Sequence, residues 1–317
     1  MKAYAGAPAH ISAFFSPRIQ EDVDSTGSIG AGICLKRGAV AEIDIESGEG
    51  RKVFRLNGVE RELAVTAMAV SILEERAKKS VHGSFNIKTD FPDSQGFGIS
   101  AAGTLAVSLA LSHLLSLSKR DALVAAHRAE VMNRTGLGDV IAEFEGGAVL
   151  RERGGLPPAG ETARFRIVSN DEEAGLIVAL IGEKIETRSV LNNSAAIERI
   201  KVAGEKAVEE FHTRIHREKK EYYISASEFL RISRRFASEA AVITPELSRA
   251  IEAIESIGLG KRYPSSMVML GNALFFLPPS SHMEEALLEI KKALSPVYPS
   301  AHYYVDEISK QGAYLID

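Results

Sequence analysis

A glycine-rich turn that runs directly into a long apolar stretch is the feature of this chain that most restricts its fold. Residues 92–103 read Pro-Asp-Ser-Gln-Gly-Phe-Gly-Ile-Ser-Ala-Ala-Gly, and apolar residues continue to Leu117. Gly96 and Gly98 allow the backbone to turn sharply and to approach a ligand closely. The stretch from Ser100 predicts a buried helix, whose first N–H groups and positive dipole end face the turn. The spacing indicates an anion-binding site, with an ordinary tight loop before a core helix as the alternative.

The surrounding pattern predicts a mixture of strands and helices. Alternating or β-branched runs predict strands at 29–35, 40–45, 53–56 and 84–89. Asn57-Gly58 is a strong hairpin signal. An amphipathic helix is expected over 60–79, and the capping-box spacing of Ser118 and Asp121 predicts another helix that runs to about Arg134.

The clearest break in composition is at residues 153–160, which read Arg-Gly-Gly-Leu-Pro-Pro-Ala-Gly. Glycine and proline together interrupt regular structure, so we expect a domain boundary there. The two expected domains are 1–155 and 161–317. The second combines strand-like runs with helices that have clear start signals, such as Thr244-Pro245-Glu246. The fold class that follows is α+β.

The composition is that of an ordinary globular protein, and a metabolic enzyme is compatible with it. Lys and Arg number 38 against 42 Asp and Glu, for a net charge of −4, so no positive field draws nucleic acid. The single cysteine, Cys34, excludes an intrachain disulfide framework and reads as a small buried hydrophobe. No signal peptide or membrane-spanning run is apparent, and we expect a cytoplasmic protein.

The glycine-rich segment resembles the central motif of the GHMP kinases, the family of galactokinase, homoserine kinase and mevalonate kinase. That motif is usually written Pro-x-x-x-Gly-Leu-Gly-Ser-Ser-Ala-Ala. The residues that fall on it are Pro92, Gly96, Gly98, Ser100, Ala101 and Ala102. Phe97 stands for the Leu, and Ile99 replaces the first Ser and leaves the second in place. The resemblance implies that ATP phosphates bind at Gly96, Gly98, Ser100, Ala101 and Ala102.

The resemblance extends along most of the chain. Residues 7–12 lie where the family has its first motif, and Glu130 and 136–139 look like the helix glutamate and glycine-flanked aspartate of the mevalonate kinase branch. Residues 263–267 depart from the glycine-rich third motif. The implied fold has an N-terminal domain like ribosomal protein S5 domain 2 and a C-terminal ferredoxin-like domain, with ATP and substrate between them.

Three further signatures resemble one branch of this family, the archaeal pantoate kinases. They are Pro-Ala-His-Ile-Ser-Ala-Phe-Phe at 8–15, Thr-Gly-Ser-Ile-Gly-Ala-Gly at 26–32 and Met-Leu-Gly-Asn at 269–272. The resemblance implies Mg²⁺- and ATP-dependent phosphorylation of pantoate on the route to coenzyme A, and a homodimer. The alternatives are a related kinase for mevalonate, homoserine or shikimate, and a catalytically silent member that keeps the fold.

Three oxygen-bearing side chains are candidates for the chemistry. Mg²⁺ prefers hard oxygen ligands, and the resemblance assigns Ser100 and Glu130 to it. From the residues alone, Ser100 can equally cap its helix and Glu130 can be a solvated helix carboxylate. Asp139 can accept the proton of the attacking hydroxyl. It can instead orient that hydroxyl, or cap the next helix.

We expect four side chains to bind the acceptor: His10, Ser28, His127 and Arg151. Arg151 can clamp a carboxylate with two parallel hydrogen bonds, with Arg153 and Arg188 as competitors for that role. His127 precedes Glu130 by one helical turn and so shares its face. A buried histidine with a purely structural partner is the alternative.

Overall fold

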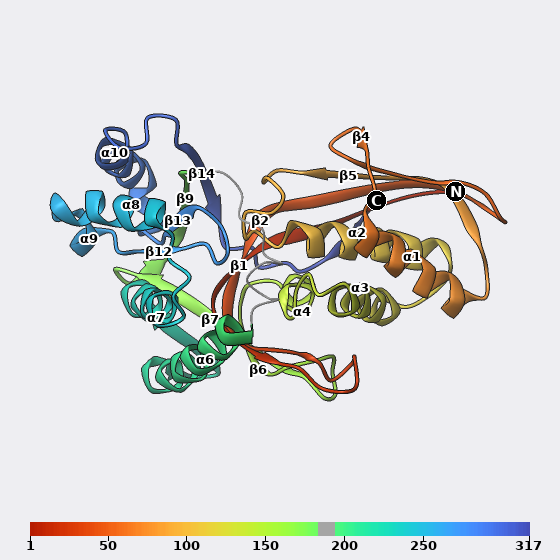
Figure 1. The fold of residues 1–317 in the computed structure, drawn as a ribbon, viewed down its shortest axis with the longest axis horizontal. Coiled ribbons are helices and arrows are strands. Elements are labelled where there is room, and N and C mark those ends of the chain that lie inside the picture. The colour runs from red at the N-terminus through yellow and green to blue at the C-terminus, as the bar shows by residue number, and fades with distance from the viewer. Residues whose placement is uncertain (183–193) are drawn as a thin grey trace.

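The computed structural model describes residues 1–182 and 194–317 of the chain. The first half builds one sheet and the helices that cover it (Figure 1). Its elements are β1 (Lys2–Arg18), β2 (Gly27–Ser47), β3 (Lys52–Leu56), β4 (Val59–Glu60), α1 (Ala64–Ala77), β5 (Val81–Thr89), α2 (Ile99–Leu114), α3 (Lys119–Asn133), α4 (Asp139–Glu145) and β6 (Ala148–Arg153).

The second half adds a smaller sheet with its own helices, and strands that join the first sheet. Its elements are β7 (Glu161–Ser169), β8 (Glu172–Glu173), β9 (Gly175–Leu180), α6 (Ser194–Arg214), β10 (His216–Glu218), β11 (Glu221–Ser225), α7 (Ala226–Glu239), α8 (Pro245–Ser256), α9 (Leu259–Arg262), β12 (Ser265–Met267), β13 (Ala273–Phe276), η1 (Ser280–His282), α10 (Met283–Leu294), β14 (His302–Glu307) and β15 (Tyr314–Ile316). The strands that join the first sheet are β7, β8, β10, β11 and β15.

The large sheet is organised around β2. Its first part pairs with β6 at Gly30–Ile33, and its second part pairs with β5 at Ala39–Ser47. Two separate strands were expected here, and that expectation was wrong, because Gly38 does not end the strand. A Cβ at Gly38 would lie 2.2 Å from the carbonyl oxygen of Ala7, so only glycine lets β1 pass this closely. The register of β1 shifts on both sides of the segment His10–Ser12.

Helix α2 covers one face of this sheet, and α1 and α3 pack against α2 and against each other. The α2 helix is buried along most of its length and packs on β1 and β2 as well as on both neighbouring helices. The predicted capping box of α3 is confirmed, since the side chains of Ser118 and Asp121 each accept from the other's backbone N–H. The Asn57-Gly58 turn between β3 and β4 is also confirmed. This layer therefore presents the N-terminus of α2 at one end of the sheet.

The small sheet has the order β12-β13-β9-β14, with α10 packed on β9 and α8 packed on α10. A second apolar core joins it to α6, α7 and the inner part of β1 and β2. In the part of the chain that the structure describes, no helix is long and apolar enough to cross a membrane.

The composition break at 153–160 is not a break in the sheet. It connects β6 to β7, and these two strands are paired antiparallel within the large sheet. The chain also returns later, because β15 pairs with β1, with Tyr4 opposite Ile316. The division into domains 1–155 and 161–317 stays a prediction. Strands from both sides of this boundary pair within the large sheet, β6 with β7 and β1 with β15.

Candidate active site

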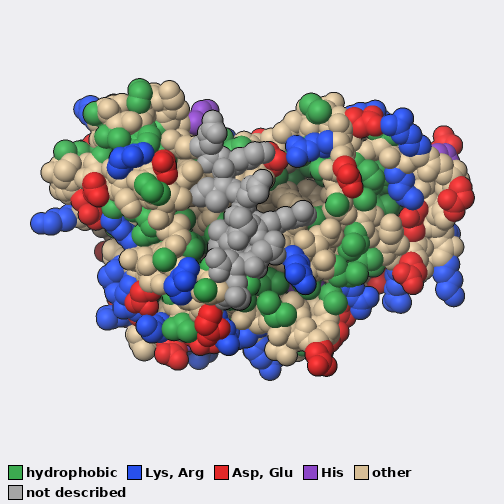
Figure 2. All heavy atoms as spheres, viewed as in Figure 1, with side chains coloured by type: hydrophobic (Ala, Val, Ile, Leu, Met, Phe, Trp, Pro, Cys, Tyr) green, Lys and Arg blue, Asp and Glu red, His purple; other side chains and the backbone are tan. Residues whose placement is uncertain are grey.

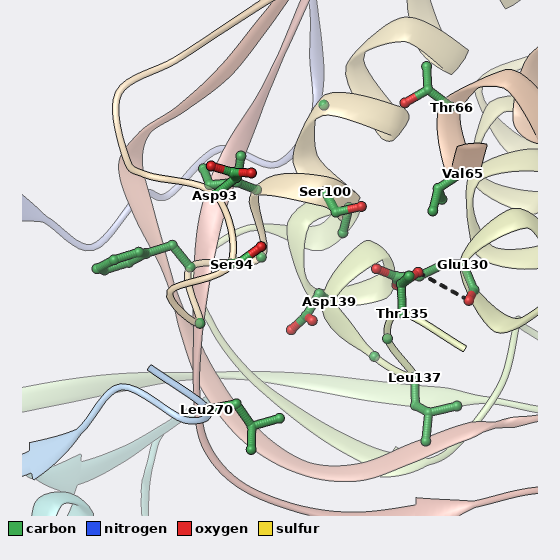
Figure 3. Close-up of a pocket in the computed structure, with 18 of the residues that line it drawn as sticks. Val65, Thr66, Asp93, Ser94, Ser100, Glu130, Thr135, Leu137, Asp139 and Leu270 are labelled. Carbon is green, nitrogen blue, oxygen red and sulfur yellow. Dashed lines mark hydrogen bonds between the residues drawn. The ribbon is translucent and has the colours of Figure 1, made fainter. Parts of the chain in front are cut away.

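A cavity of about 740 Å³ opens where the glycine-rich loop, α3, α4 and the loop after β12 meet. This volume is typical of small-molecule sites. Figure 2 shows the surface hollowed between the lobe that carries α1 and the lobe that carries α8 and α10. Figure 3 shows Ser100, Glu130, Thr135 and Asp139 around one opening, contributed by α2, α3, the following loop and α4.

The glycine-rich loop has the backbone geometry that its sequence predicts. Gly96 and Gly98 have φ angles of 81° and 65°, a region that favours glycine, and Gly98 is the residue before α2. Ser100 is exposed and lines the cavity together with Ala101. The first N–H groups of α2 therefore face the cavity without intrahelical partners.

Ala102 was expected to contact phosphate and is placed differently. Its N–H donates to the carbonyl of Gly98 at 2.9 Å, so the amide is already used within the helix. Its side chain is fully buried in the apolar core between the large sheet and helices α1 to α3. The structure thus assigns Ala102 to packing, and the anion-facing amides end at Ala101.

The loop 268–272 from the second half packs onto the glycine-rich loop. A Cβ at Gly271 would lie 2.1 Å from the carbonyl oxygen of Gln95, and a Cβ at Gly96 would lie 2.2 Å from that of Met269. The buried Gln95 side chain accepts from the N–H of Asn272 at 3.3 Å and donates to the carbonyl of Gly182 at 3.2 Å. The Met-Leu-Gly-Asn signature therefore supports the anion site. This role of Gln95 was not predicted, because nothing in the sequence shows that Gly182 and Asn272 lie next to it.

Asp139 is the first residue of α4 and reaches the cavity with 28% of its side chain exposed. Its Oδ1 lies 2.7 Å from Nδ1 of His10 on β1. Burial by itself raises the pKa of Asp139, but the hydrogen bond and electrostatic attraction of His10 and the nearby charge of Arg151 outweigh it. The pKa of this carboxyl is therefore lowered, and Asp139 is ionised at neutral pH.

His10 was expected to bind the acceptor, and the structure places it behind Asp139 instead. Its side chain is fully buried, and its Nε2 faces Gly32, where a Cβ would lie only 2.2 Å away. Nε2 has no hydrogen-bond partner among the described residues. Burial lowers the pKa of His10 despite the opposing effect of Asp139. A neutral ring that donates from Nδ1 to Asp139 satisfies both observations.

Glu130 lies on α3 with only 3% of its surface exposed, so the expected alternative of a solvated helix carboxylate was wrong. Burial, and then repulsion from Asp139, raise the pKa of Glu130 well above its usual value. Gly136 packs against it, since a Cβ there would lie 2.6 Å from the carboxyl carbon. Thr135 donates through Oγ1 to the backbone carbonyl of Glu130 at 3.3 Å and closes the helix end (Figure 3).

The oxygen ligands at this end of the cavity suit Mg²⁺ rather than a metal that needs a full protein cage. Among residues 1–182 and 194–317, no group of three His, Cys, Asp or Glu side chains could hold a metal. The Glu130 carboxylate and the Ser100 hydroxyl both line the cavity. Mg²⁺ commonly takes one or two protein oxygens and completes its shell with phosphates and water. The residues present therefore fit a metal that arrives with a nucleotide.

Arg151 is a buried cation at the other side of the cavity. It lies on β6 with 2% of its surface exposed, and its Nε and Nη1 have no hydrogen-bond partner among the described residues. Gly138 leaves room for the Arg151 side chain, because a Cβ at Gly138 would lie 2.6 Å from Nε of Arg151 and 2.5 Å from Oγ of Ser28. Burial lowers the pKa of Arg151, which the charge of Asp139 partly opposes. A buried guanidinium with free N–H groups calls for an anion.

Arg153 and Arg188 were the alternatives to Arg151 for binding the carboxylate of the acceptor. Arg153 has 62% of its side chain exposed and pairs with Glu161 at 3.0 Å, away from the cavity. Arg188 lies outside the described residues. Ser28 lines the cavity beside Arg151, where it was expected.

His127 does not line the cavity. Its side chain is buried beneath the connection between β1 and β2, and Nε2 lies 3.3 Å from the carbonyl oxygen of Val23. Burial lowers the pKa of His127 despite that hydrogen bond. The next residue, Arg128, holds the same connection through two hydrogen bonds to Asp24, of 2.6 and 2.7 Å. The predicted acceptor contact is therefore not what the structure shows, and the structural alternative describes His127.

The cavity thus joins a helix start suited to anions, two carboxyl groups whose pKa values are shifted in opposite directions and a buried guanidinium whose Nε and Nη1 lack partners among the residues described. These are the parts that a phosphotransferase needs for positioning and charge compensation. The model of the GHMP kinases N terminal domain matches residues 62–147. The fold and the site define a small-molecule kinase of the GHMP type.

Individual relatives narrow the group. The chain is 33% identical over 285 residues to the pantoate kinase of Thermococcus kodakarensis, which covers 88% of each chain. It is 29% identical over 300 residues to the pantoate kinase of Methanocaldococcus jannaschii, or 94% of this chain and 99% of that one. A solved structure described as a phosphotransferase related to the CoA biosynthesis pathway superposes with a TM-score of 0.80 at 30% identity, over 100% and 99% of the two chains. The chain belongs to the GHMP kinases, in the same family as the pantoate kinases. The fold class predicted from the sequence is confirmed.

Proposed function

We propose that the protein transfers the γ-phosphoryl group of ATP to a hydroxyl of pantoate and so forms 4-phosphopantoate, a step on the route to coenzyme A. The observation that carries the proposal is Arg151, a buried guanidinium whose Nε and Nη1 have no hydrogen-bond partner in the described part of the chain. It lies on the same cavity as the ionised Asp139. A small acceptor with both a carboxylate and a hydroxyl matches this pair, and pantoate has both.

The phosphates of ATP are assigned to the glycine-rich loop. The amides from Gly98 to Ala101 lack intrahelical partners, and the helix dipole favours negative charge at this end. Ser100 and Glu130 are assigned to Mg²⁺, which when bound offsets charge on the transferred phosphoryl group. The raised pKa of Glu130 agrees with a carboxylate that lacks a positive partner until a cation arrives.

Asp139 receives the proton of the acceptor hydroxyl. As that oxygen forms its bond to the γ-phosphorus, the bond from phosphorus to the β–γ bridging oxygen breaks and ADP leaves. The hydrogen bond from Nδ1 of His10 holds Asp139 in one orientation and keeps it ionised before the reaction. Arg151 and Ser28 hold the acceptor so that its hydroxyl meets Asp139.

An acceptor panel tests the proposal. Purified protein is assayed for ADP release with pantoate, mevalonate, homoserine and shikimate, each with Mg²⁺ and ATP. We expect the highest kcat/KM with pantoate. A higher value with another acceptor would replace pantoate and leave the kinase class, and no turnover with any acceptor would favour a silent, nucleotide-binding member.

Three further expectations belong to this proposal. They are two domains at 1–155 and 161–317, a homodimer in solution and a cytoplasmic location. Sedimentation velocity of the purified protein tests the homodimer directly.

A further inference from the structure

Glu143 is a buried carboxyl group to which the reaction above assigns no role. It lies on α4, one helical turn after Asp139, so the two side chains share one face of that short helix. Its surface is fully buried, and neither of its carboxyl oxygens has a hydrogen-bond partner in the described part of the chain. A buried carboxylate without a partner is costly, so this position demands a physical reason.

The carboxyl group of Glu143 presses against the turn of the glycine-rich loop. A Cβ at Gly98 would lie 2.4 Å from Oε1 of Glu143. The same Cβ position at Gly98 lies 3.3 Å from Cβ of His10, whose backbone N–H donates to the carbonyl of Phe97 at 2.9 Å. His10 of β1 and the end of the Glu143 side chain therefore meet Gly98 on the same side of the turn. One turn of α4 thus links the glycine-rich loop to Asp139.

Burial and the neighbouring carboxyl groups decide which form of Glu143 fits this place. Burial, and then repulsion from Asp139 and Glu130, raise the pKa of Glu143 well above its usual value. Cys34, which donates to the carbonyl of Ala142 at 3.2 Å, is a further neighbour that carries no positive charge. A carboxylate behind Gly98 would also repel a triphosphate bound on the opposite side of the turn.

We propose that Glu143 is a positioning residue that works as a neutral carboxylic acid, holding the Gly98 turn at a set distance from Asp139. Its length and shape matter, and a negative charge on it does not. This inference rests on the proposed binding of ATP phosphates at the glycine-rich loop. It adds that the loop is supported from behind by a protonated side chain.

Two measurements on purified protein test the inference without an acceptor. The first is the dissociation constant of a non-hydrolysable ATP analogue with Mg²⁺, by calorimetry. The second is the infrared carbonyl-stretch band of protonated carboxylic acids at neutral pH, as a difference between wild type and variant. The variants are Glu143→Gln, which keeps the shape without charge, and Glu143→Ala, which removes the support. Glu145→Gln on the same helix is the matched control.

We expect Glu143→Gln to bind the analogue within about twofold of wild type and to lose part of the carboxylic acid band. Glu143→Ala should bind about tenfold more weakly, because small misplacements of binding groups are costly. If the alanine variant does not fold, Glu143→Asp, which withdraws the carboxyl from Gly98, should show the weakening. Glu145→Gln should change neither measurement.

Other outcomes overturn the inference. An unchanged infrared band in Glu143→Gln would mean that Glu143 is ionised, and weakened binding in that variant would mean that its charge is needed. Wild-type affinity in both Glu143→Ala and Glu143→Asp would remove the positioning role. Failure of the wild-type protein itself to bind the analogue would instead contradict the proposed ATP site.

Discussion

The Nδ1 atom of His10 lies 2.7 Å from Oδ1 of Asp139, which joins β1 to the start of α4 across 129 positions of the sequence. His10 is fully buried, so this contact reaches Asp139 from the protein side and leaves the cavity side of the carboxyl free. The register shifts of β1 on both sides of His10 allow the strand to aim this side chain at α4.

Replacement of His10 should therefore act through Asp139. Without the donor, the pKa of Asp139 should rise, because burial raises this pKa and the hydrogen bond that lowers it is lost. Since the ionised carboxylate is the reactive form, the acid limb of the kcat profile should move to higher pH in His10→Ala. Loss of a charged hydrogen bond, worth about 1.5–3 kcal/mol, predicts a fall in kcat of about tenfold or more on that limb.

The matched variant His10→Asn keeps a donor near the position of Nδ1. It should recover a large part of the wild-type pH profile, whereas the alanine variant should not. Identical profiles for all three proteins would show that His10 has no influence on the reactive carboxylate.

Asp139→Asn tests the proton acceptor itself. The change keeps the shape and removes the charge, and general base catalysis is worth roughly 10²–10⁴-fold, so kcat should fall by that order. Binding of ATP should persist, since the glycine-rich loop is untouched. The experiment compares single-turnover rate and melting temperature on one preparation. A variant that melts early but turns over normally would restrict Asp139 to helix capping.

Arg151→Ala tests the anion clamp. A charged hydrogen bond lost at a desolvated site costs about 1.5–3 kcal/mol, so KM for the acceptor should rise more than about tenfold while KM for ATP changes little. Arg153→Ala, two residues along the same strand but exposed and paired with Glu161, is the control and should leave both constants unchanged. Equal effects of the two substitutions would contradict a specific clamp.

Glu130→Gln should have opposite effects on stability and on metal use. The pKa of Glu130 is raised in the fold, so its ionisation costs stability once the pH exceeds the ordinary value of the unfolded chain. Without metal, the Gln variant should therefore melt at a higher temperature than wild type at neutral pH, and the difference should shrink in acid.

With Mg²⁺ and an ATP analogue present, wild type should gain more melting temperature than Glu130→Gln, and the variant should need more Mg²⁺ for turnover. Melting curves with and without Mg²⁺ measure both effects. An unchanged Mg²⁺ requirement would remove Glu130 from the metal site.

Local signals in the sequence predicted the elements whose cause is local. The glycines at 96 and 98 adopt positive φ where the motif requires it, and the Ser118 capping box begins α3. The α2 helix was expected at 100–117 and lies at Ile99–Leu114. Glu130 and Asp139 lie on one cavity, and both were chosen through the family pattern rather than through local chemistry.

What could not be predicted depends on contacts between distant segments. No spacing rule shows that His10 lies behind Asp139 rather than in the cavity, because a strand bulge sets its direction. The same holds for Glu143, because its contact with the Gly98 turn joins two distant segments of the chain. The glycine-proline segment at 153–160 looks like a linker, yet β6 and β7 on either side of it remain hydrogen-bonded.

The pairing of β15 with β1 has a consequence for biosynthesis. The strand at Tyr314–Ile316 pairs with β1, which is synthesised first. Just before that strand, the N–H of Ala313 donates to the carbonyl of Glu143 at 3.0 Å. On the ribosome, α4 and the edge of β1 must therefore wait for residues 313–316 to emerge before they are fully supported. A nascent chain stalled before that point would contain every residue assigned to catalysis but would lack the hydrogen bond from Ala313 that supports α4.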